Sequence, residues 1–193
     1  MATLYGISGY ARVGKDSFAE ILAHELYKRD GRSPKRYSFA RALKEMLDPF
    51  STEHLGISAF TTDDDKKKII RPTLVGLGES ARKITENFWV NKIAPKVQES
   101  LAQGFDCVVT DVRYQNEALW IKSFENSRIF GLIRHGVSAP NNEEAQSIPL
   151  VFELADEIIK WPEISHSEEM SVLSCEELRS VVRSVLTTKK GEV

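Results

Sequence analysis

The sequence has few cysteines, no long apolar run and almost no net charge, and each absence excludes a class of protein. Two distant cysteines, Cys107 and Cys175, do not form a disulfide framework or a metal site, so we expect both to be reduced and structural. There is no stretch of about 18 apolar residues that could cross a bilayer and no signal-peptide pattern at the start, so we expect a cytoplasmic protein that does not enter a membrane. The net charge of −2 offers no global field for a nucleic-acid backbone, so we expect no stable nucleic-acid binding and a strictly local anion site.

Short β-rich segments alternate with longer helical patterns along the chain. This alternation is typical of βαβ units, so we expect an α/β fold with about five parallel strands flanked by helices. A chain of 193 residues suits one core, so we expect a single domain over 1–193 with a helical insert at about 51–103. The expected strands are 3–8, 36–39, 105–111, 127–134 and 156–161.

Apolar spacing places one helix after the first strand and another near the end of the chain. Ser174 and Glu177 have the spacing of a capping box, which predicts the start of the last helix. Pro49 is expected to stop a helix behind the second strand, because proline removes a backbone donor. The apolar faces are Phe18, Ile21, Leu22 and Leu26 in the first helix and Leu178, Val181, Val182 and Val185 in the last.

The segment "HGVSAPNNEEAQSIP" is polar and contains proline, which predicts a mobile, lid-like loop at about 135–150. Arg134 stands just before it. This arginine is either a lid residue that stabilises charge on a transferring group or a plain surface arginine. His135 is a weaker candidate for contact with a nucleotide.

The segment "GYARVGKDS", residues 9–17, follows the first expected strand and opens an amphipathic helix. In this context the pattern G-x-x-x-x-G-K predicts a phosphate-binding loop, because backbone N–H groups and the helix dipole then point at an anion. Lys15 supplies a positive charge. The candidate nucleotide-binding residues are Gly9, Tyr10, Ala11, Arg12, Val13, Gly14, Lys15, Asp16 and Ser17.

Asp16 departs from the usual pattern, which has a hydroxyl directly after the lysine; here Ser17 brings the hydroxyl one residue later. Two interpretations are open. Asp16 either holds the Mg²⁺ shell or the attacking oxygen, or it is a carboxylate favoured by the helix dipole.

A second polar cluster, "VVTDVRYQNEA" (108–118), follows the third expected strand. Asp111 lies at the carboxyl end of that strand, where open α/β sheets bind ligands. Arg113 offers a planar, bidentate grip on phosphate, and Asp111 is a candidate for metal or substrate. The alternatives are a helix cap for Asp111 and solvated ion pairs for Arg113 and Glu117.

The segments "GYARVGKDS", "YSFARALKEML", "LVGLGESARKITENFWV" and "TDVRYQNEA" occur in this order, and together they resemble the deoxynucleoside monophosphate kinases of tailed bacteriophages. The resemblance covers residues 3–134. In that family Gly-Lys-Asp replaces Gly-Lys-Ser/Thr. It implies a P-loop kinase fold, a location in the host cytoplasm if the protein is phage-encoded, and transfer of the γ-phosphoryl group of ATP, with Mg²⁺, to a deoxynucleoside 5′-monophosphate.

The resemblance also implies how the site is divided. The loop residues would surround the donor phosphates, with Lys15, Asp16, Arg113 and Arg134 as candidate catalytic residues. Asp16, Ser17 and Asp111 are the candidates for the metal. The acceptor pocket would comprise Phe39, Ala40, Lys44, Glu79, Arg82, Trp89, Asp111, Arg113 and Asn116.

Two of the acceptor candidates can also be interpreted from the residues themselves. Arg82 follows "GLGES", a stretch expected to be flexible. Trp89 could stack on a base, or it could be a core residue, which is the commoner fate of a helical tryptophan. The family's His-x-Ser-Glu element should precede the fifth strand, whereas "SHSEE", with His166, follows it here.

Other functions share the donor half of this site. Dephospho-coenzyme A, a shikimate-like alcohol or a modified base in DNA could be the acceptor, although a DNA-acting enzyme should carry a basic stripe. A non-catalytic nucleotide-binding protein is a further alternative. The sequence does not set the oligomeric state, and a homodimer stays open.

Overall fold

The computed structural model describes residues 1–163 and 171–187, so His166 lies outside the described residues. They fall into two compact units. The sheet unit comprises Met1–Tyr37 and Gln98–Val193, and the helical unit comprises Ser38–Val97. The second unit begins earlier than the insert expected from the sequence. In the described residues no helix has the length and apolar character that crossing a bilayer requires.

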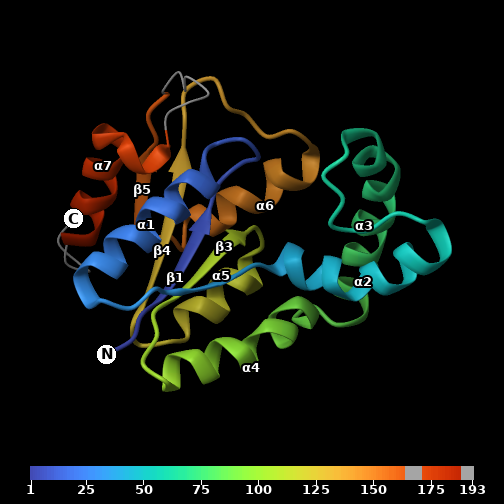
Figure 1. The fold of residues 1–193 in the computed structure, drawn as a ribbon, viewed down its shortest axis with the longest axis horizontal. Coiled ribbons are helices and arrows are strands. Elements are labelled where there is room, and N and C mark those ends of the chain that lie inside the picture. Colours follow the sequence, from blue (N-terminus) through green and yellow to red (C-terminus); the bar gives the residue numbers. More distant parts are fainter. Residues whose placement is uncertain (164–170, 188–193) are drawn as a thin grey trace. The chain divides into compact units, whose positions relative to one another are not determined.

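The sheet unit is built on five parallel strands, which confirms the predicted α/β class. They are β1 (Leu4–Ser8), β2 (Lys35–Tyr37), β3 (Cys107–Val112), β4 (Ser127–Ile133) and β5 (Glu157–Lys160). Their order is β2-β3-β1-β4-β5, so β1 lies at the centre between β3 and β4 (Figure 1). Because the carboxyl ends of parallel strands meet at one edge, the segments after β1, β3 and β4 are neighbours there.

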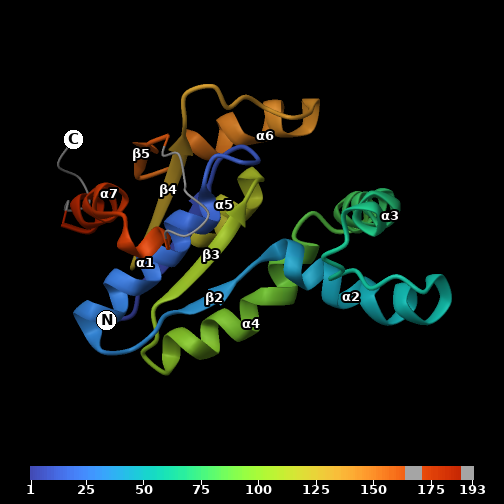
Figure 2. The same ribbon diagram turned by 45° about the horizontal axis from the view of Figure 1, so that its top comes forward.

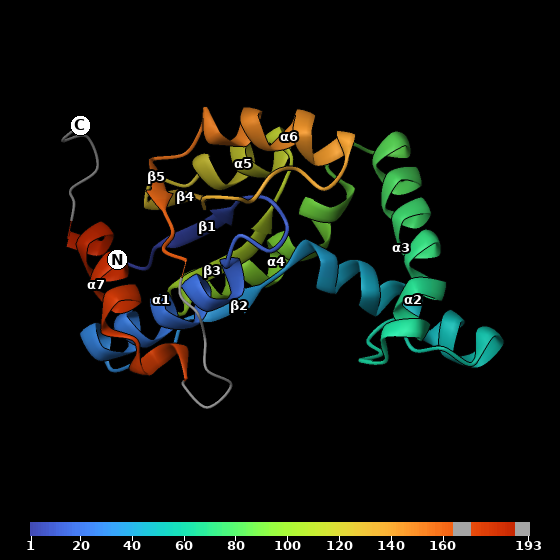
Figure 3. The same ribbon diagram turned by 90° about the horizontal axis from the view of Figure 1, so that it is seen from above.

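Helices cover both faces of this sheet. Helices α1 (Lys15–Asp30) and α7 (Glu176–Thr187) pack together over one face (Figure 2). Helices α5 (Gln115–Lys122) and α6 (Asn142–Phe152) lie on the other face (Figure 3). Here a Cβ at Gly6 would meet Ile121 of α5, and one at Gly131 would meet Phe152 of α6. The central strands β1, β3 and β4 are therefore largely buried on both faces, as parallel strands require, while the edge strands β2 and β5 are more exposed.

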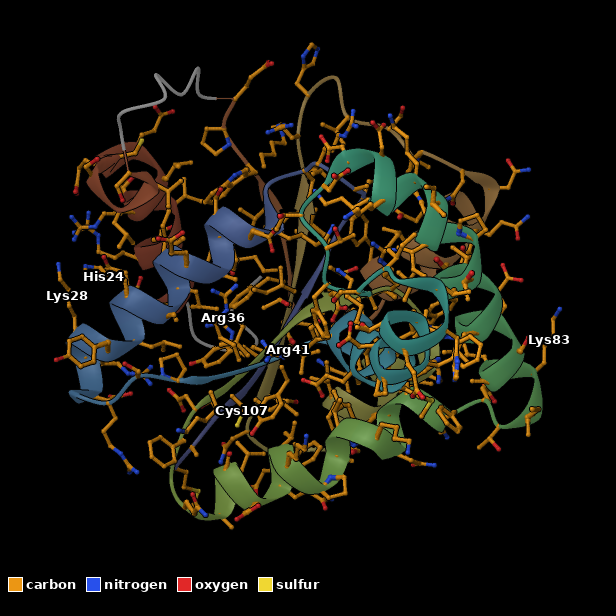
Figure 4. All side chains as sticks on the ribbon, turned by 45° about the vertical axis from the view of Figure 1, so that its right-hand side comes forward. His24, Lys28, Arg36, Arg41, Lys83 and Cys107 are labelled. Atoms are coloured by element: carbon orange, nitrogen blue, oxygen red, sulfur yellow. The ribbon has the colours of Figure 1, made fainter. Side chains whose placement is uncertain are left out.

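The apolar faces predicted for α1 and α7 are confirmed. Phe18, Ile21, Leu22 and Leu26 are fully buried, and α7 adds Leu178, Val182 and Val185 to the same core, with Val181 partly buried. Both cysteines are free, as expected. Burial raises the pKa of the Cys107 thiol to about 12, so this thiol is inert. Figure 4 shows Cys107 inside the fold and Lys28 pointing outward from α1.

The helical unit contains α2 (Phe39–Leu55), α3 (Asp64–Ile84) and the first part of α4 (Phe88–Ala102). Leu47, Ala59 and Ile70 form its small core. The Asp48 carboxylate accepts hydrogen bonds from the Ser58 hydroxyl at 2.6 Å and the Ala59 amide at 2.8 Å. These bonds fix the turn between α2 and α3.

Two expectations for this unit are wrong. Pro49 does not stop a helix; it lies inside α2, which continues to Leu55 and ends at Gly56 in the left-handed conformation. Residues 76–80, expected to be flexible, lie inside α3, where Gly78 is buried and a Cβ would lie 2.9 Å from Leu43 Cδ1. Tertiary packing outweighs the local cost of proline and glycine in both helices.

Two expectations for the sheet unit are also wrong. Residues 142–152 form α6 rather than a loop, because the Asn141 side chain accepts a hydrogen bond from the Glu144 amide and caps the helix. The unstructured connection after β4 is therefore shorter than predicted. Ser174 does not cap α7; it ends a short 3-10 turn (Val172–Ser174), and α7 begins at Glu176.

Candidate active site

The turn between β1 and α1 has the backbone of a phosphate-binding loop. Gly9 has a φ of +145° and Gly14 one of +111°. In the described part of the chain, Arg12 is the one residue other than glycine that has a positive φ, at +66°. A Cβ at Gly9 would lie 2.7 Å from the Leu132 carbonyl oxygen, and one at Gly14 would overlap the indole of Trp161. Both glycines of the motif are therefore required by sterics as well as by conformation.

Lys15 lies folded against this turn. Its ammonium group donates to the carbonyl oxygens of Gly9 at 2.7 Å and Tyr10 at 2.8 Å. Burial lowers the pKa of Lys15, and the nearby Arg113 cation lowers it further, while the carboxylates of Glu144, Asp16 and Asp111 act in the opposite direction. The partly desolvated lysine therefore lies among charges of both signs, one guanidinium and three carboxylates.

Arg113 and Arg134 reach this site from the strands beside β1. Arg134, just after β4, donates to the carbonyl oxygen of Arg12 at 2.5 Å. Arg113, just after β3, lies 3.2 Å from the Glu144 carboxylate through Nη1, with 43% of its side chain exposed. The order of the strands therefore gathers three predicted residues, Lys15, Arg113 and Arg134, at one edge of the sheet.

Glu117 does not form the solvated ion pair considered as an alternative in the sequence, because its carboxylate is buried. It accepts hydrogen bonds from the backbone amides of Arg113 at 2.9 Å and Tyr114 at 3.2 Å, at the start of α5. Glu117, rather than Asp111, supplies this cap, and it fixes the backbone that carries Arg113. Asp111 remains in β3, half-buried, and Asn116 lies in the first turn of α5.

Two residues of this site were missed in the sequence. Glu144 is 3% exposed and accepts a hydrogen bond from the Ala11 amide at 2.9 Å. Trp161, 5% exposed, packs on Gly14 and on Phe18. The spacing of Asn141 and Glu144 is a helix-start signal that could have revealed α6, but no sequence signal links either residue to the loop.

The remaining acceptor candidates belong to the helical unit, and their part in a pocket stays a prediction. Trp89 is 2% exposed and its indole N–H donates to the Gly78 carbonyl oxygen at 3.2 Å. This is the core alternative, and it leaves no ring face open to a base. The Lys44 ammonium lies 5.8 Å from the centroid of the Phe60 ring. The others are Phe39, which is buried, and Ala40, Glu79 and Arg82.

In the described part of the chain, no three His, Cys, Asp or Glu side chains form a group that could enclose a metal ion. Mg²⁺ does not need such a group, because it binds through one or two carboxylates together with substrate phosphates. Asp16 and Asp111 both lie close enough to influence the charge of Lys15, and Ser17 follows in the first turn of α1. An oxygen-only donor set of this kind fits Mg²⁺.

Comparison with known proteins gives the fold but not the family. No family model and no curated protein matches the sequence. Among solved structures, TT1252 from Thermus thermophilus is 13% identical with a TM-score of 0.50, over 97% of this chain and 99% of that one. The dephospho-CoA kinase from Campylobacter jejuni is 20% identical with a TM-score of 0.46, over 96% of each chain. Shikimate kinase from Acinetobacter baumannii is 12% identical with a TM-score of 0.41, over 96% and 92%.

Of these, the similarity to TT1252 speaks for the fold alone, and it agrees with the α/β architecture and strand order described above. Such a fold does not specify the acceptor.

The packing of Trp161 on the loop can be tested with Gly14→Ala. We expect this change to destabilise the protein by about 1–3 kcal/mol more than a positive φ alone, because the new methyl group overlaps the indole. Gly14→Ala in a Trp161→Ala background, compared with Trp161→Ala alone, is the control, since it keeps the φ of +111° but removes the indole that the methyl group would overlap. Urea unfolding gives the loss of stability in each background, and equal losses would contradict the steric account.

Proposed function

We propose that this protein is an ATP-dependent kinase that phosphorylates a deoxynucleoside 5′-monophosphate to the diphosphate. The observation that carries the proposal is the convergence of Lys15, Arg113 and Arg134 on the turn between β1 and α1. Phosphoryl transfer needs positioning and charge neutralisation more than covalent chemistry, and this cluster offers both. The acceptor is inferred from the sequence resemblance.

Each residue has a role that follows from its chemistry. The loop amides and the start of α1 would bind the donor phosphates. Lys15 would leave the loop carbonyls and neutralise charge on the β- and γ-phosphate oxygens. Arg113 would hold the acceptor phosphate in a bidentate grip, and Arg134 would face the transferring group. Asp16, Ser17 and Asp111 would hold Mg²⁺, directly or through water, and the ion supplies further charge neutralisation when bound.

A coupled ADP-release assay tests the proposed function. ATP is supplied with each deoxynucleoside monophosphate, with dephospho-coenzyme A and with shikimate, and we expect turnover to be fastest with one of the monophosphates. Lys15→Ala should lower kcat by about a hundredfold or more while the fold remains intact. Faster turnover with dephospho-coenzyme A or shikimate would identify a different P-loop kinase, and no turnover with any acceptor would favour a binding protein.

The division of the site is tested with Arg113→Lys and Arg82→Lys. A guanidinium fixes the acceptor phosphate in two bonds and an ammonium does not, so both changes should raise KM for the monophosphate by about tenfold. KM for ATP should stay nearly constant. Steady-state titration of each substrate gives the answer, and a selective loss of ATP affinity would show that the two halves are assigned the wrong way round.

Substitution of Asp16 distinguishes between its two possible roles, in catalysis and in stabilising the helix dipole. If it holds the metal shell or the attacking oxygen, Asp16→Asn should lower kcat about tenfold or more with little change in the melting temperature. A carboxylate that only favours the helix dipole is worth about 0.3–1 kcal/mol of stability and nothing in rate. Ser17→Ala is the companion variant. Unchanged kcat with a lower melting temperature for Asp16→Asn would support the dipole role.

A further inference from the structure

Glu144 joins three parts of the sheet unit at one carboxylate. It is the third residue of α6, it accepts the Ala11 amide of the phosphate-binding turn at 2.9 Å, and it pairs with Arg113 at 3.2 Å. Its side chain is only 5% exposed. A buried charge is costly unless it is paired and hydrogen-bonded, so its position is strongly determined by these two contacts.

The local sequence predicts that the Glu144 carboxylate accepts the N-cap amide of its own helix, but it bonds other groups instead. After an Asn N-cap, a glutamate three residues later normally returns to the backbone amide of the cap. Here Asn141 accepts the Glu144 amide at 2.8 Å, but the Glu144 carboxylate bonds Ala11 and Arg113 instead. A residue that departs from its local rule at a functional edge is a candidate for a functional role.

The two partners of Glu144 belong to different halves of the site proposed above. Ala11 lies in the donor loop, and Arg113 follows β3 on the acceptor side. The Glu117 cap fixes the Arg113 backbone but leaves its long side chain to be oriented by something else. Glu144 contacts one nitrogen of a guanidinium with a broad set of donors, so the remaining N–H groups can still face a phosphate.

We propose that Glu144 is a positioning residue that holds the Arg113 guanidinium against the donor loop, so that a phosphate bound by Arg113 is aligned with the donor phosphates. This inference rests on the proposed function. The alignment matters because in-line transfer requires the two reacting groups to be held in one geometry. The sequence patterns did not single out Glu144, which makes both of these contacts from α6.

Glu144→Gln removes the charge and keeps an oxygen that can accept the Ala11 amide. We expect KM for the monophosphate to rise about tenfold and kcat to fall, while KM for ATP changes by less than about twofold. Glu144→Asp keeps the charge but is one methylene too short to reach both partners, so it should show the same pattern. This second variant covers the case in which Glu144→Gln does not fold.

Glu143→Gln is the matched control. Glu143 stands in the same first turn of α6 but is exposed, and it accepts the Tyr114 hydroxyl rather than the loop amide. Its kinetic constants should stay within about twofold of the unmodified protein. Arg113→Lys in the Glu144→Gln background should raise KM for the monophosphate by less than a further twofold or so, because both changes remove the same positioned guanidinium.

Three kinetic results would overturn the proposal. Lower stability with unchanged KM and kcat for Glu144→Gln would leave Glu144 a purely structural cap. A lower KM for the monophosphate would mean that the carboxylate competes with the acceptor phosphate instead of positioning its arginine. Independent, additive effects of the two substitutions would equally contradict a shared role.

A second measurement does not need an accepted substrate. By NMR, the Ala11 amide proton should move upfield in Glu144→Gln, and titration with inorganic phosphate should perturb the Arg113 guanidinium at lower concentration in the unmodified protein than in the variant. If no monophosphate is phosphorylated but these shifts occur, the proposed function fails and the positioning role stands. Equal phosphate affinity in both proteins would overturn that role.

Discussion

The sheet unit depends on one constraint: the tight turn after β1 folds back so that the Lys15 ammonium lies against its carbonyl groups. Gly9 and Gly14 satisfy the conformational part, and Trp161 and the Leu132 carbonyl occupy the space that a side chain would need. The partly desolvated Lys15 then requires compensating charge. The carboxylates of Glu144 in α6, Asp16 and Asp111 provide it, whereas the Arg113 cation after β3 acts against it.

The start of α6 places the Glu144 carboxylate beside the groups whose charge and hydrogen-bonding capacity it satisfies. A mobile loop after β4 would leave the Ala11 amide and the Arg113 guanidinium to water, whereas the capped helix brings a buried carboxylate to both. The same arrangement fixes a long arginine side chain that is otherwise 43% exposed. In the proposed function, preorganisation of this kind would lower the cost of aligning charged groups on a phosphate.

The sequence predicted the parts that are local in the chain. The turn before α1, the strands and the faces of α1 and α7 are encoded by residues a few positions apart, and the structure confirms them. The predictions failed where proline or polar composition suggested a break but long-range packing or a cap stabilised a helix, as at Pro49 and in α6. The contact between Glu144 and Ala11 joins residues 133 positions apart, which no local pattern encodes.

Features encoded by neighbouring residues were predictable and contacts between distant residues were not, and this difference also limits what the fold says about the substrate. The donor half proposed above is one continuous segment, and kinases with different acceptors would share it, so the motif does not distinguish among acceptors. The proposed acceptor half is assembled from residues far apart in sequence. Trp89 shows the difficulty, because this candidate for stacking on a base is 2% exposed and donates its indole N–H to the Gly78 carbonyl oxygen. Arg113 is the exception, since its backbone is fixed by Glu117 and its side chain by Glu144. In the proposed kinase, selectivity for the acceptor would therefore come from side chains positioned by packing rather than by the motif.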